Sequence, residues 1–375
     1  MKRIALITHG GVDIPGTGVQ VPFLLDLIER VSKSYETLVF SPRPSADYPA
    51  ESQCSLARIQ FVQADRTQPP LIKAASLWRA VISEHRLKPF DLLHGFWAIP
   101  SGTLAVMLAR RLRLPAAVSL HGAETANLPA IGYGHMSSPL TRQLTRWTCK
   151  RADAVIVLSR HQRDALRTWG MANTNVSLIP PGATPSFYGV PAKPFPEGVV
   201  RILHVANLTP VKDQGTLLRA FADILKKREA QLRIVGGDYL DGAVQRLALE
   251  LGIAAHVEFR GYIGHDQMTQ EYSWADLLMH TSLHEAGCVV VSEAAAANVL
   301  ICGTSVGPIA DLAGSAAIGV LPGDYRALAD ETLAVLQDRE RFLDLRAQAR
   351  SWAEKFTIES TANELSRVYE ALTAK

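Results

Sequence analysis

Cysteine is scarce in this sequence, and apolar runs long enough to span a membrane are missing. Four cysteines occur among 375 residues with no C-x-x-C spacing, which argues against a disulfide framework or a structural zinc site. No stretch reaches the ~18 to 20 uncharged apolar residues that a membrane span needs. The apolar run after Met1-Lys2-Arg3 is too short for a secretory signal. We therefore expect a cytoplasmic protein that does not cross a membrane.

A strong net charge is also lacking. The 39 Lys and Arg against 36 Asp and Glu leave +3, which is too small to imply nucleic-acid binding by itself. Residues 1–190 hold 21 basic and 12 acidic residues and residues 191–375 hold 18 and 24, so the halves carry +9 and −6. The composition, 47% hydrophobic and 20% charged, is that of a folded protein with a large core. The two halves are expected to meet different partners.

The usual phosphate-binding fingerprints are absent as well. Neither G-x-x-x-x-G-K-[ST] nor G-x-G-x-x-G occurs. Ser41-Pro42-Arg43 follows the second expected strand, where a dinucleotide enzyme has an acidic residue. A nucleoside triphosphatase and a dinucleotide oxidoreductase are therefore disfavoured. The Gly-rich turn from His9 to Gly18 is either a ligand-binding loop or merely a tight turn.

Short apolar runs alternate with amphipathic stretches along most of the chain, which predicts parallel sheets built from strand and helix units. The expected strands are residues 3–8, 37–40, 58–62, 91–94, 116–120, 154–158 and 177–179, followed by 201–206, 231–235, 256–260 and 277–281. Proline and glycine interrupt the pattern between Pro180 and Gly198, where we place the linker. Residues 325–373 then show three helix-like segments.

The fold class expected from this pattern is α/β, with two Rossmann-like doubly wound domains. The first comprises residues 1–185 and the second comprises residues 198–356. A C-terminal helix, about residues 357–375, is expected to pack back on the first domain.

One lysine stands directly before a predicted helix at residues 214–227. Lys212 lies in the turn Ala206–Gln214 that follows the first strand of the second domain. Free backbone N–H groups and the positive end of a helix dipole meet at such a turn, and a lysine adds a point charge suited to a diphosphate. The alternative is a solvated lysine near a helix N-terminus.

Two glutamates, Glu285 and Glu293, flank a loop and the start of a predicted helix at residues 290–297. The run from Leu283 to Leu300 is apolar and rich in small residues, so carboxylates in it need polar partners. Sugar or ribose hydroxyls would supply them. The alternative is a pair of surface glutamates, which this spacing alone does not exclude.

Several segments match, in order, those of the family 4 retaining glycosyltransferases, and the chain resembles this family over nearly its whole length. The resemblance implies the GT-B fold, in which two Rossmann-like domains face each other across a cleft. In this family the second domain binds the nucleotide sugar, the first receives the acceptor, and reaction occurs in the cleft. The segments that carry the resemblance are Asp91–His94, Leu120–Gly122, Arg151–Ser159, Leu178–Gly182, Leu208–Lys212, Leu232–Gly237, Phe259–Gly261 and Glu285–Glu293.

The resemblance implies a role for each charged motif residue. Glu293 would hold the nucleotide ribose, and Glu285 would face the donor hexose. Lys212 would neutralise the diphosphate, and His121 would approach the hexose from the first domain. Glu285, His121 and Lys212 are thus the expected catalytic residues.

Further groups complete the donor site that the resemblance implies. The loop of Gly287, Cys288 and Val289 would offer N–H groups to sugar and phosphate, and Gly11 would bring backbone close to the phosphates. Tyr262 lies in the stretch where the nucleotide base docks in this family.

The sequence departs from the family at two points. Asn207, which we still expect to contact the donor, stands where Arg is common, so Lys212 lacks its usual cationic partner at the diphosphate. Ala286-Gly287-Cys288 replaces the usual Gly-Phe-Gly. The Asp-x-Asp triplet of metal-dependent glycosyltransferases does not occur, so we expect metal-independent chemistry with no metal site and no cofactor.

The expected activity is retaining transfer of a hexosyl unit from a nucleotide diphosphate sugar to an acceptor hydroxyl, in polysaccharide, lipopolysaccharide or glycolipid synthesis. The acceptor would be a carbohydrate or a lipid-linked molecule and not a nucleic acid. The alternative is a non-catalytic nucleotide-sugar-binding protein of the same fold, which Asn207 keeps open.

The basic first half indicates a surface for that acceptor. Arg142, Arg146 and Lys150 are spaced four apart on one face of a predicted helix. The plain interpretation is a solvated helix face. The alternative is contact with an anionic acceptor or an anionic membrane, which would place the protein peripherally at the inner membrane face. The other basic residues of this stretch are Arg151, Arg160, Arg163 and Arg167.

Overall fold

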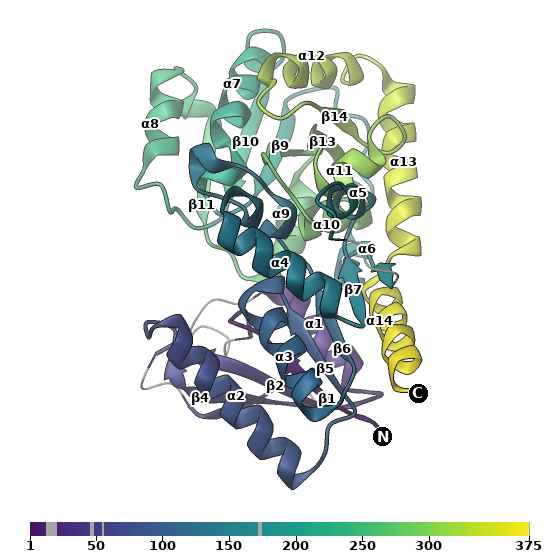
Figure 1. Ribbon diagram of the computed structural model, residues 1–375. Helices are drawn as coiled ribbons and strands as arrows, with labels where there is room; N and C mark the ends of the chain where they lie inside the picture. Colours follow the sequence, from purple (N-terminus) through teal and green to yellow (C-terminus); the bar gives the residue numbers. More distant parts are fainter. Residues whose placement is uncertain (13–20, 46–48, 55, 172–174, 375) are drawn as a thin grey trace. The chain divides into compact units, whose positions relative to one another are not determined.

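The computed structural model describes residues 1–12, 21–45, 49–54, 56–171 and 175–374. They form two compact α/β units (Figure 1). Unit 1 comprises Met1–Leu158, Gln162–Pro180 and Ile358–Lys375, and unit 2 comprises Ser159–His161 and Pro181–Thr357. The C-terminal segment therefore belongs to the first unit, which confirms the predicted return of the chain.

The sheet of unit 1 contains β1 (Arg3–Ile7), β2 (Glu36–Arg43), β3 (Glu51–Cys54), β4 (Ala57–Asp65), β5 (Leu92–Phe96), β6 (Ala116–Ser119), β7 (Ala154–Val157) and β8 (Val176–Leu178). Their order across the sheet is β3-β4-β2-β1-β5-β6-β7-β8. Neighbouring strands are parallel, except for β3 and β4, which are antiparallel. Every residue of β1 is buried, as expected of a strand that is covered by helices on both faces of the sheet.

The described part of unit 1 contains the helices α1 (Pro22–Val31), α2 (Pro70–Leu87), α3 (Thr103–Leu112), α4 (Pro139–Arg151), α14 (Ile358–Thr373) and, apart from its first two residues, α5 (Arg160–Thr168). The sequence of α1 shows why it forms: Phe23, Leu24, Leu27 and Ile28 recur at helical spacing and are all buried. These residues give the helix one apolar face for the core.

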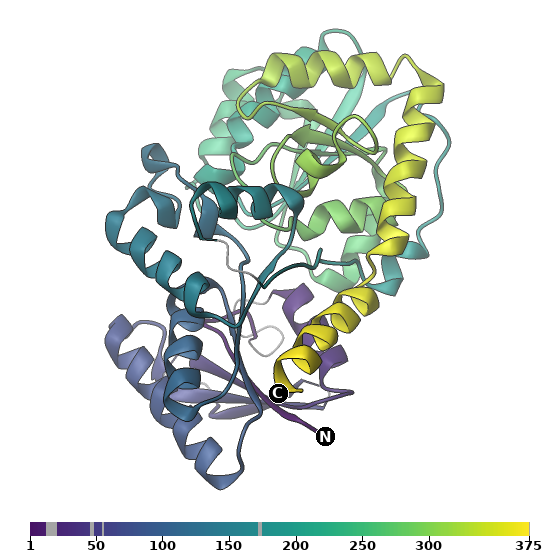
Figure 2. The ribbon, with the colours of Figure 1, turned by 45° about the vertical axis from the view of Figure 1, so that its right-hand side comes forward.

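Helix α14, at the yellow end of the chain in Figure 2, packs on α1 and β5 of unit 1. Buried polar side chains also hold it there. The hydroxyl of Tyr369 lies 2.6 Å from Nδ1 of His94, and Nε2 of His94 lies 2.8 Å from Oγ of Ser119. Both the tyrosine and the histidine are fully buried. At the end of the helix, Lys2 Nζ donates to the carbonyl oxygen of Thr373 at 3.2 Å, so the two ends of the chain are neighbours.

The sheet of unit 2 contains β9 (Val200–Val205), β10 (Ala230–Val235), β11 (Val257–Gly261), β12 (Leu277–His280), β13 (Leu300–Thr304) and β14 (Ile318–Val320). The order is β11-β10-β9-β12-β13-β14, and the strand pairs are parallel. The strand order reverses between β9 and β12. In sheets of this kind, ligands bind beyond the carboxyl ends of the strands at that reversal.

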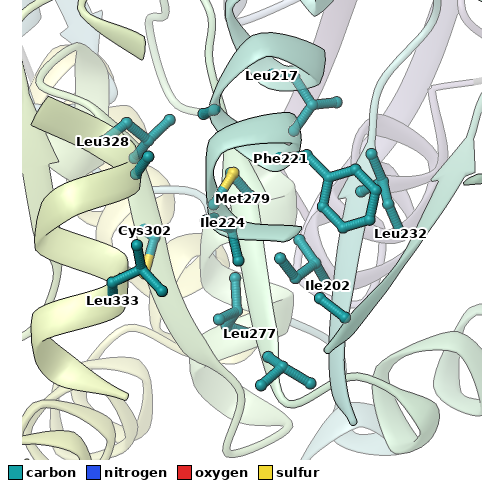
Figure 3. Close-up of a cluster of buried hydrophobic side chains, with 14 of the residues drawn as sticks. Ile202, Leu217, Phe221, Ile224, Leu232, Leu277, Met279, Cys302, Leu328 and Leu333 are labelled. Atoms are coloured by element: carbon teal, nitrogen blue, oxygen red, sulfur yellow. The ribbon is translucent and has the colours of Figure 1, made fainter. Parts of the chain in front are cut away.

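The described part of unit 2 contains the helices α6 (Pro185–Tyr188), α7 (Gln214–Leu225), α8 (Ala243–Glu250), α9 (Met268–Trp274), α10 (Val289–Ala296), α11 (Gly307–Leu312), α12 (Tyr325–Val335) and α13 (Arg339–Lys355). Figure 3 shows how α7 reaches the core: Leu217, Phe221 and Ile224 point towards Ile202 of β9 and Leu232 of β10. All five side chains are buried. Their spacing of three and four residues gives α7 the apolar face that the sequence predicts.

Three strands, β3, β13 and β14, are not among those that the sequence pattern predicts. The strand β13 stands in an apolar stretch that is continuous with α10, and apolar runs alone do not separate a buried strand from a helix. The strand β14 has three residues, too few for a periodic signal. A 3₁₀ turn, His265–Gln267, leads directly into α9 at Met268. Among the described residues, no helix has both the length and the apolar character that crossing a membrane requires.

We expect Tyr369→Phe to lower the free energy of unfolding of unit 1 by about 1 to 3 kcal/mol, because it leaves Nδ1 of His94 buried without its partner. Urea unfolding followed by tryptophan fluorescence measures the change. Tyr239→Phe is the matched control, since Tyr239 is 64% exposed and its variant should stay within ~0.5 kcal/mol of the parent. If the two variants unfold at the same urea concentration, the buried hydroxyl does not stabilise the helix.

Candidate functional site

The carboxylate of Glu285 is the meeting point of several side chains beyond the carboxyl ends of β9 and β12. Nζ of Lys212 lies 2.5 Å from its Oε1, and Nε2 of His280 lies 2.8 Å from the same oxygen. The hydroxyl of Ser282 donates to this oxygen at 2.6 Å. The side chain of Glu285 keeps only 11% of its surface exposed. The structure therefore brings the predicted Lys212 and Glu285 into direct contact.

The contacts of Glu285 determine its charge state. Burial raises the pKa of this carboxyl, but the Lys212 ammonium and the hydrogen bond from His280 outweigh burial and hold the pKa well below its usual range. The carboxyl is therefore ionised at neutral pH. An ionised carboxylate only accepts hydrogen bonds, so this group suits hydroxyl or ammonium donors.

Backbone contacts bring Lys212 to Glu285. Lys212 is the last residue of a 3₁₀ turn. The next residue, Asp213, has a left-handed backbone conformation and caps α7, because its side chain accepts a hydrogen bond from the N–H of Thr216 at 3.2 Å. The hydroxyl of Thr281 donates to the carbonyl oxygen of Lys212 at 3.1 Å, and the N–H of Leu283 donates to the carbonyl oxygen of Val211 at 2.8 Å. The loop after β12 is thus tied to the turn after β9.

Glu293 is buried in α10 and already has two side-chain partners. Nε2 of His265 lies 3.1 Å from its Oε1, and the hydroxyl of Tyr272 donates to its Oε2 at 2.8 Å. Burial and the adjacent carboxylate raise the pKa of Tyr272 well above its usual value, so the phenol keeps the proton that it donates. The second predicted glutamate is therefore a fixed, hydrogen-bonded group and not a surface residue.

The amino end of α10 carries the loop that the sequence analysis singles out. Cys288 is the residue before the helix and has a φ of 35°, a left-handed conformation that strains a residue with a side chain. Among the described residues, the N–H groups of Gly287 and Cys288 have no hydrogen-bond acceptor. Val289 is the first residue of the helix. Two backbone donors and the positive end of the helix dipole thus come together here.

Three possible metal ligands lie in this cluster. Nε2 of His280, Sγ of Cys288 and a carboxylate oxygen of Glu285 are within 4.8 Å of one another, and the sulfur lies 3.3 Å from Nε2. The thiol does not favour a metal, because burial and the neighbouring Glu285 raise the pKa of Cys288 well above its usual value. The Lys212 ammonium pairs with the same carboxylate, so a metal ion would compete with a cation that the chain itself supplies.

Asn207 has a structural contact that the sequence does not reveal. Its Oδ1 accepts from the N–H of Gly237 at 3.0 Å, and its carbonyl oxygen accepts from Nε2 of Gln214 at 3.2 Å. Gly236 passes so close to Ala206 that a Cβ would lie 2.0 Å from the carbonyl oxygen of Ala206, so only glycine fits there. Asn207 joins the turns that follow β9 and β10.

The remaining predicted donor residues lie elsewhere. Tyr262 follows β11 and is 70% exposed. Gly11 lies in unit 1 beyond β1 with a φ of 85°, and its carbonyl oxygen accepts from the N–H of Val21 at 2.9 Å. Residues 13–20 of the same Gly-rich turn lie outside the described residues.

His121 follows β6 in unit 1 and lies among aromatic rings. The ring centroids of Phe96 and Trp97 are 5.4 and 5.3 Å from that of His121. Burial lowers the pKa of His121 to about 4, with His9 as a lesser cause, so the imidazole is neutral at pH 7. Its Nε2 is buried and has no hydrogen-bond partner among the described residues. Glu124, which the sequence analysis does not identify, holds the loop by accepting from the N–H of Gly122 at 2.7 Å.

Sequence reasoning misses four side chains of the site in unit 2: His280, Ser282, His265 and Tyr272. A signal exists for His280, because it ends β12, and residues at the carboxyl end of a strand border the place where ligands bind. His265 and Tyr272 carry no such signal. They approach Glu293 only because α9 and the turn before it fold over α10.

Both units match known families. Residues 18–182 match the family described as "Glycosyl transferase 4-like domain", and residues 190–352 match "Glycosyl transferases group 1". The two ranges together include most of the chain.

Curated relatives match over nearly the full length. The D-inositol 3-phosphate glycosyltransferase of Nocardia farcinica is 25% identical over 393 residues, which cover 95% of this chain and 86% of the relative. The GDP-mannose-dependent alpha-(1-6)-phosphatidylinositol monomannoside mannosyltransferase of Mycobacterium tuberculosis is 26% identical over 380 residues, which cover 94% of each chain.

Solved structures establish the fold. Sucrose-phosphate synthase from Thermosynechococcus elongatus superposes with a TM-score of 0.84 at 20% identity and covers 100% of both chains. The Anabaena protein HepE, solved in complex with UDP and glucose, gives a TM-score of 0.79 at 18% identity, covering 99% of this chain and all of the other. The matched families, the relatives and the fold agree, and the chain belongs to the family 4 glycosyltransferases of the GT-B fold.

Proposed function

We propose that this glycosyltransferase moves a hexosyl unit from a nucleoside diphosphate sugar to an acceptor hydroxyl, with retention of the anomeric configuration. The observation that carries the proposal is the ion pair of Lys212 and Glu285 beside the amino end of α10, at the carboxyl edge of the sheet of unit 2. Retention rests on the resemblance to the family. The solved structure of HepE, which has a similar fold and contains UDP and glucose, supports a nucleoside diphosphate sugar as the donor.

The chemistry of the leaving group explains why such a site is useful. Departure of a nucleoside diphosphate places negative charge on phosphate oxygens, and preorganised positive groups aimed at that charge lower the barrier. Lys212 supplies one charge, and the N–H groups of Gly287 and Cys288 supply donors at a helix amino end. These groups would stabilise the charge on the leaving diphosphate, which metal-dependent transferases stabilise with a divalent ion. We infer metal-independent chemistry on this basis.

The two glutamates would hold the two sugars of the donor. Each carboxylate oxygen has two lone pairs, so Glu293 can keep His265 and Tyr272 and still accept from ribose hydroxyls. Glu285 would accept from hydroxyls of the hexose while its low pKa keeps it ionised. His121, neutral and with a buried unpartnered Nε2 among the described residues, would hydrogen-bond to the hexose from unit 1.

We expect Glu285→Gln to reduce turnover far more than nucleotide binding, and Glu293→Gln to weaken chiefly nucleotide binding. The reason is that one side chain would face the hexose and the other the ribose. Calorimetric titration with UDP, GDP and ADP gives the affinities, and NMR of the first product reports both turnover and the anomeric configuration. An unchanged nucleoside diphosphate affinity for Glu293→Gln would contradict the ribose assignment, and an inverted product would contradict retention.

We expect Lys212→Ala to cost on the order of 10²-fold in kcat, as loss of one preorganised charge-stabilising group does. Lys226→Ala is the matched control, because Lys226 is a lysine of the same unit that pairs with Asp223 at the surface. Initial rates with and without EDTA complete the measurement. A Lys212→Ala enzyme with nearly full activity, or a parent enzyme that EDTA inactivates and Mg²⁺ restores, would contradict the assignment of the lysine as the charge-neutralising group.

The acceptor side of the proposal rests on a basic surface formed by α3 and α4 of unit 1. From residue 99 to residue 152 the chain has seven Lys or Arg and a single acidic residue, Glu124, which is buried and bonded to backbone. Arg110 and Lys150 are exposed on the two helices, and Met107 and Leu140 expose 47% and 77% of their surfaces. We propose that this surface contacts an anionic membrane that carries a lipid-linked acceptor.

One predicted member of this surface is engaged elsewhere. The guanidinium of Arg142 donates to the carbonyl oxygen of Met136, at 2.6 Å from Nη2, and lies over the ring of Trp169. Its main role is therefore to hold the turn before α4. Arg163 and Arg167 of α5 also have a local partner, Asp164.

We expect the protein to sediment with anionic vesicles at low salt and to be released at high salt. Each basic residue near such a surface contributes about 1 kcal/mol, and salt screens charges beyond a Debye length of about 10 Å at 0.1 M. The double variant Arg110→Glu and Lys150→Glu should lose this binding, whereas Lys226→Glu in unit 2 should keep it. Equal recovery in the supernatant with anionic and neutral vesicles would leave α3 and α4 as a solvated surface.

A further inference from the structure

A buried histidine shares the carboxylate oxygen of Glu285 with Lys212. His280 is the last residue of β12 and exposes only 1% of its surface. Its Nε2 lies 2.8 Å from Oε1 of Glu285, 2.9 Å from Oγ of Ser282 and 3.3 Å from Sγ of Cys288. The imidazole therefore contacts the side chains of Ser282 and Cys288 as well as the carboxylate of Glu285.

The chemistry of these partners determines the tautomer of His280. The ionised carboxylate of Glu285 only accepts, so Nε2 must carry the proton and donate it. The opposite nitrogen, Nδ1, is buried and has no hydrogen-bond partner among the described residues. Burying a polar atom without a hydrogen-bond partner is unfavourable. An apolar side chain at this position would avoid that cost, so the benefit of the histidine has to come from its contact with Glu285.

A second buried histidine provides the contrast. The ring of His204 in β9 stacks on that of His280 with centroids 5.7 Å apart. Nδ1 of His204 donates to the carbonyl oxygen of Met279 at 2.9 Å, and its Nε2 lies 3.4 Å from Nε2 of Gln214. Both of its nitrogens thus have partners, and neither of these two contacts involves Glu285. His204 is a packing neighbour of His280 with a structural role.

We propose that His280 is a positioning residue, which holds the carboxylate of Glu285 through Nε2–H so that Oε1 stays directed at the donor hexose. This inference rests on the proposed function. Glu285 needs a hydrogen-bond donor besides Lys212 because of the role proposed for that lysine. When the ammonium is drawn to the diphosphate of a bound donor, its hold on Glu285 weakens, and His280 together with Ser282 keeps the carboxylate in place.

His280→Leu and His280→Gln test the proposal as a pair. The leucine variant removes the donor, and we expect kcat to fall by on the order of 10-fold to 100-fold, the effect of a small misplacement of a reacting group. The affinity for UDP, GDP or ADP and the melting temperature should not fall, because the leucine leaves no buried polar atom. The glutamine variant keeps an amide N–H for Glu285 and should recover most of the lost kcat.

His204→Asn is the matched control, since its amide can still donate to the carbonyl oxygen of Met279 and the variant should keep the parent kcat. In an enzyme that already carries Glu285→Gln, His280→Leu should cause no further loss. The ¹⁵N spectrum of the histidine side chains should show His280 protonated at Nε2. Together these results would support the positioning role.

Three results would overturn it. A His280→Leu enzyme with parent kcat, measured beside an impaired Glu285→Gln enzyme, would reject the role of His280 and leave the proposed function intact. A loss of kcat in His204→Asn as large as in His280→Leu, or a lower melting temperature in His280→Leu, would indicate a packing effect. Full activity of Glu285→Gln would instead reject the proposed function on which the inference rests.

Discussion

The ion pair of Lys212 and Glu285 is the interaction on which the arrangement of the site in unit 2 depends. Its members are 73 positions apart in the sequence and meet because β9 and β12 are neighbours in the sheet, so that the segments following them leave at the same edge. Backbone contacts between Leu283 and Val211 tie the two segments together. The side chains therefore meet on loops that the main chain has already aligned.

A buried ion pair is not stabilising by itself, because removing two charges from water offsets most of their attraction. The pair of Lys212 and Glu285 is supported by further donors, His280 and Ser282, which reach the same carboxylate oxygen. The Lys212 ammonium and the hydrogen bond from His280 together hold the pKa of Glu285 low, so the carboxylate stays ionised. Because His280 and Ser282 also hold the carboxylate, the ammonium is able to contact a ligand as well. Under the proposed function this cluster serves binding and not stability alone, which agrees with Nδ1 of His280 being buried without a hydrogen-bond partner among the described residues.

Under the proposed function, the two units use different electrostatics for the two substrates. Unit 2 presents an ammonium and helix N–H groups to a diphosphate, within a half of the chain that is acidic overall. Unit 1 presents the neutral imidazole of His121 near the hexose and a basic surface on α3 and α4 for an anionic acceptor. Under this proposal, the basic residues of the first half would serve an anionic acceptor, whereas the donor would depend on a few local positive groups in an otherwise acidic half.

The α/β architecture can be predicted from the sequence alone, because a buried parallel strand such as β1 needs an unbroken apolar run, and a helix such as α1 or α7 repeats its apolar residues at helical spacing. Position before a helix made Lys212 a candidate, and the apolar surroundings made Glu285 one, but the roles expected of both came from the resemblance to the family. The contact of His280 with Glu285 and the hydrogen bond from Gly237 to Asn207 could be found only in the folded chain. These contacts depend on strand order and on side-chain direction across loops, which no local pattern in the sequence encodes.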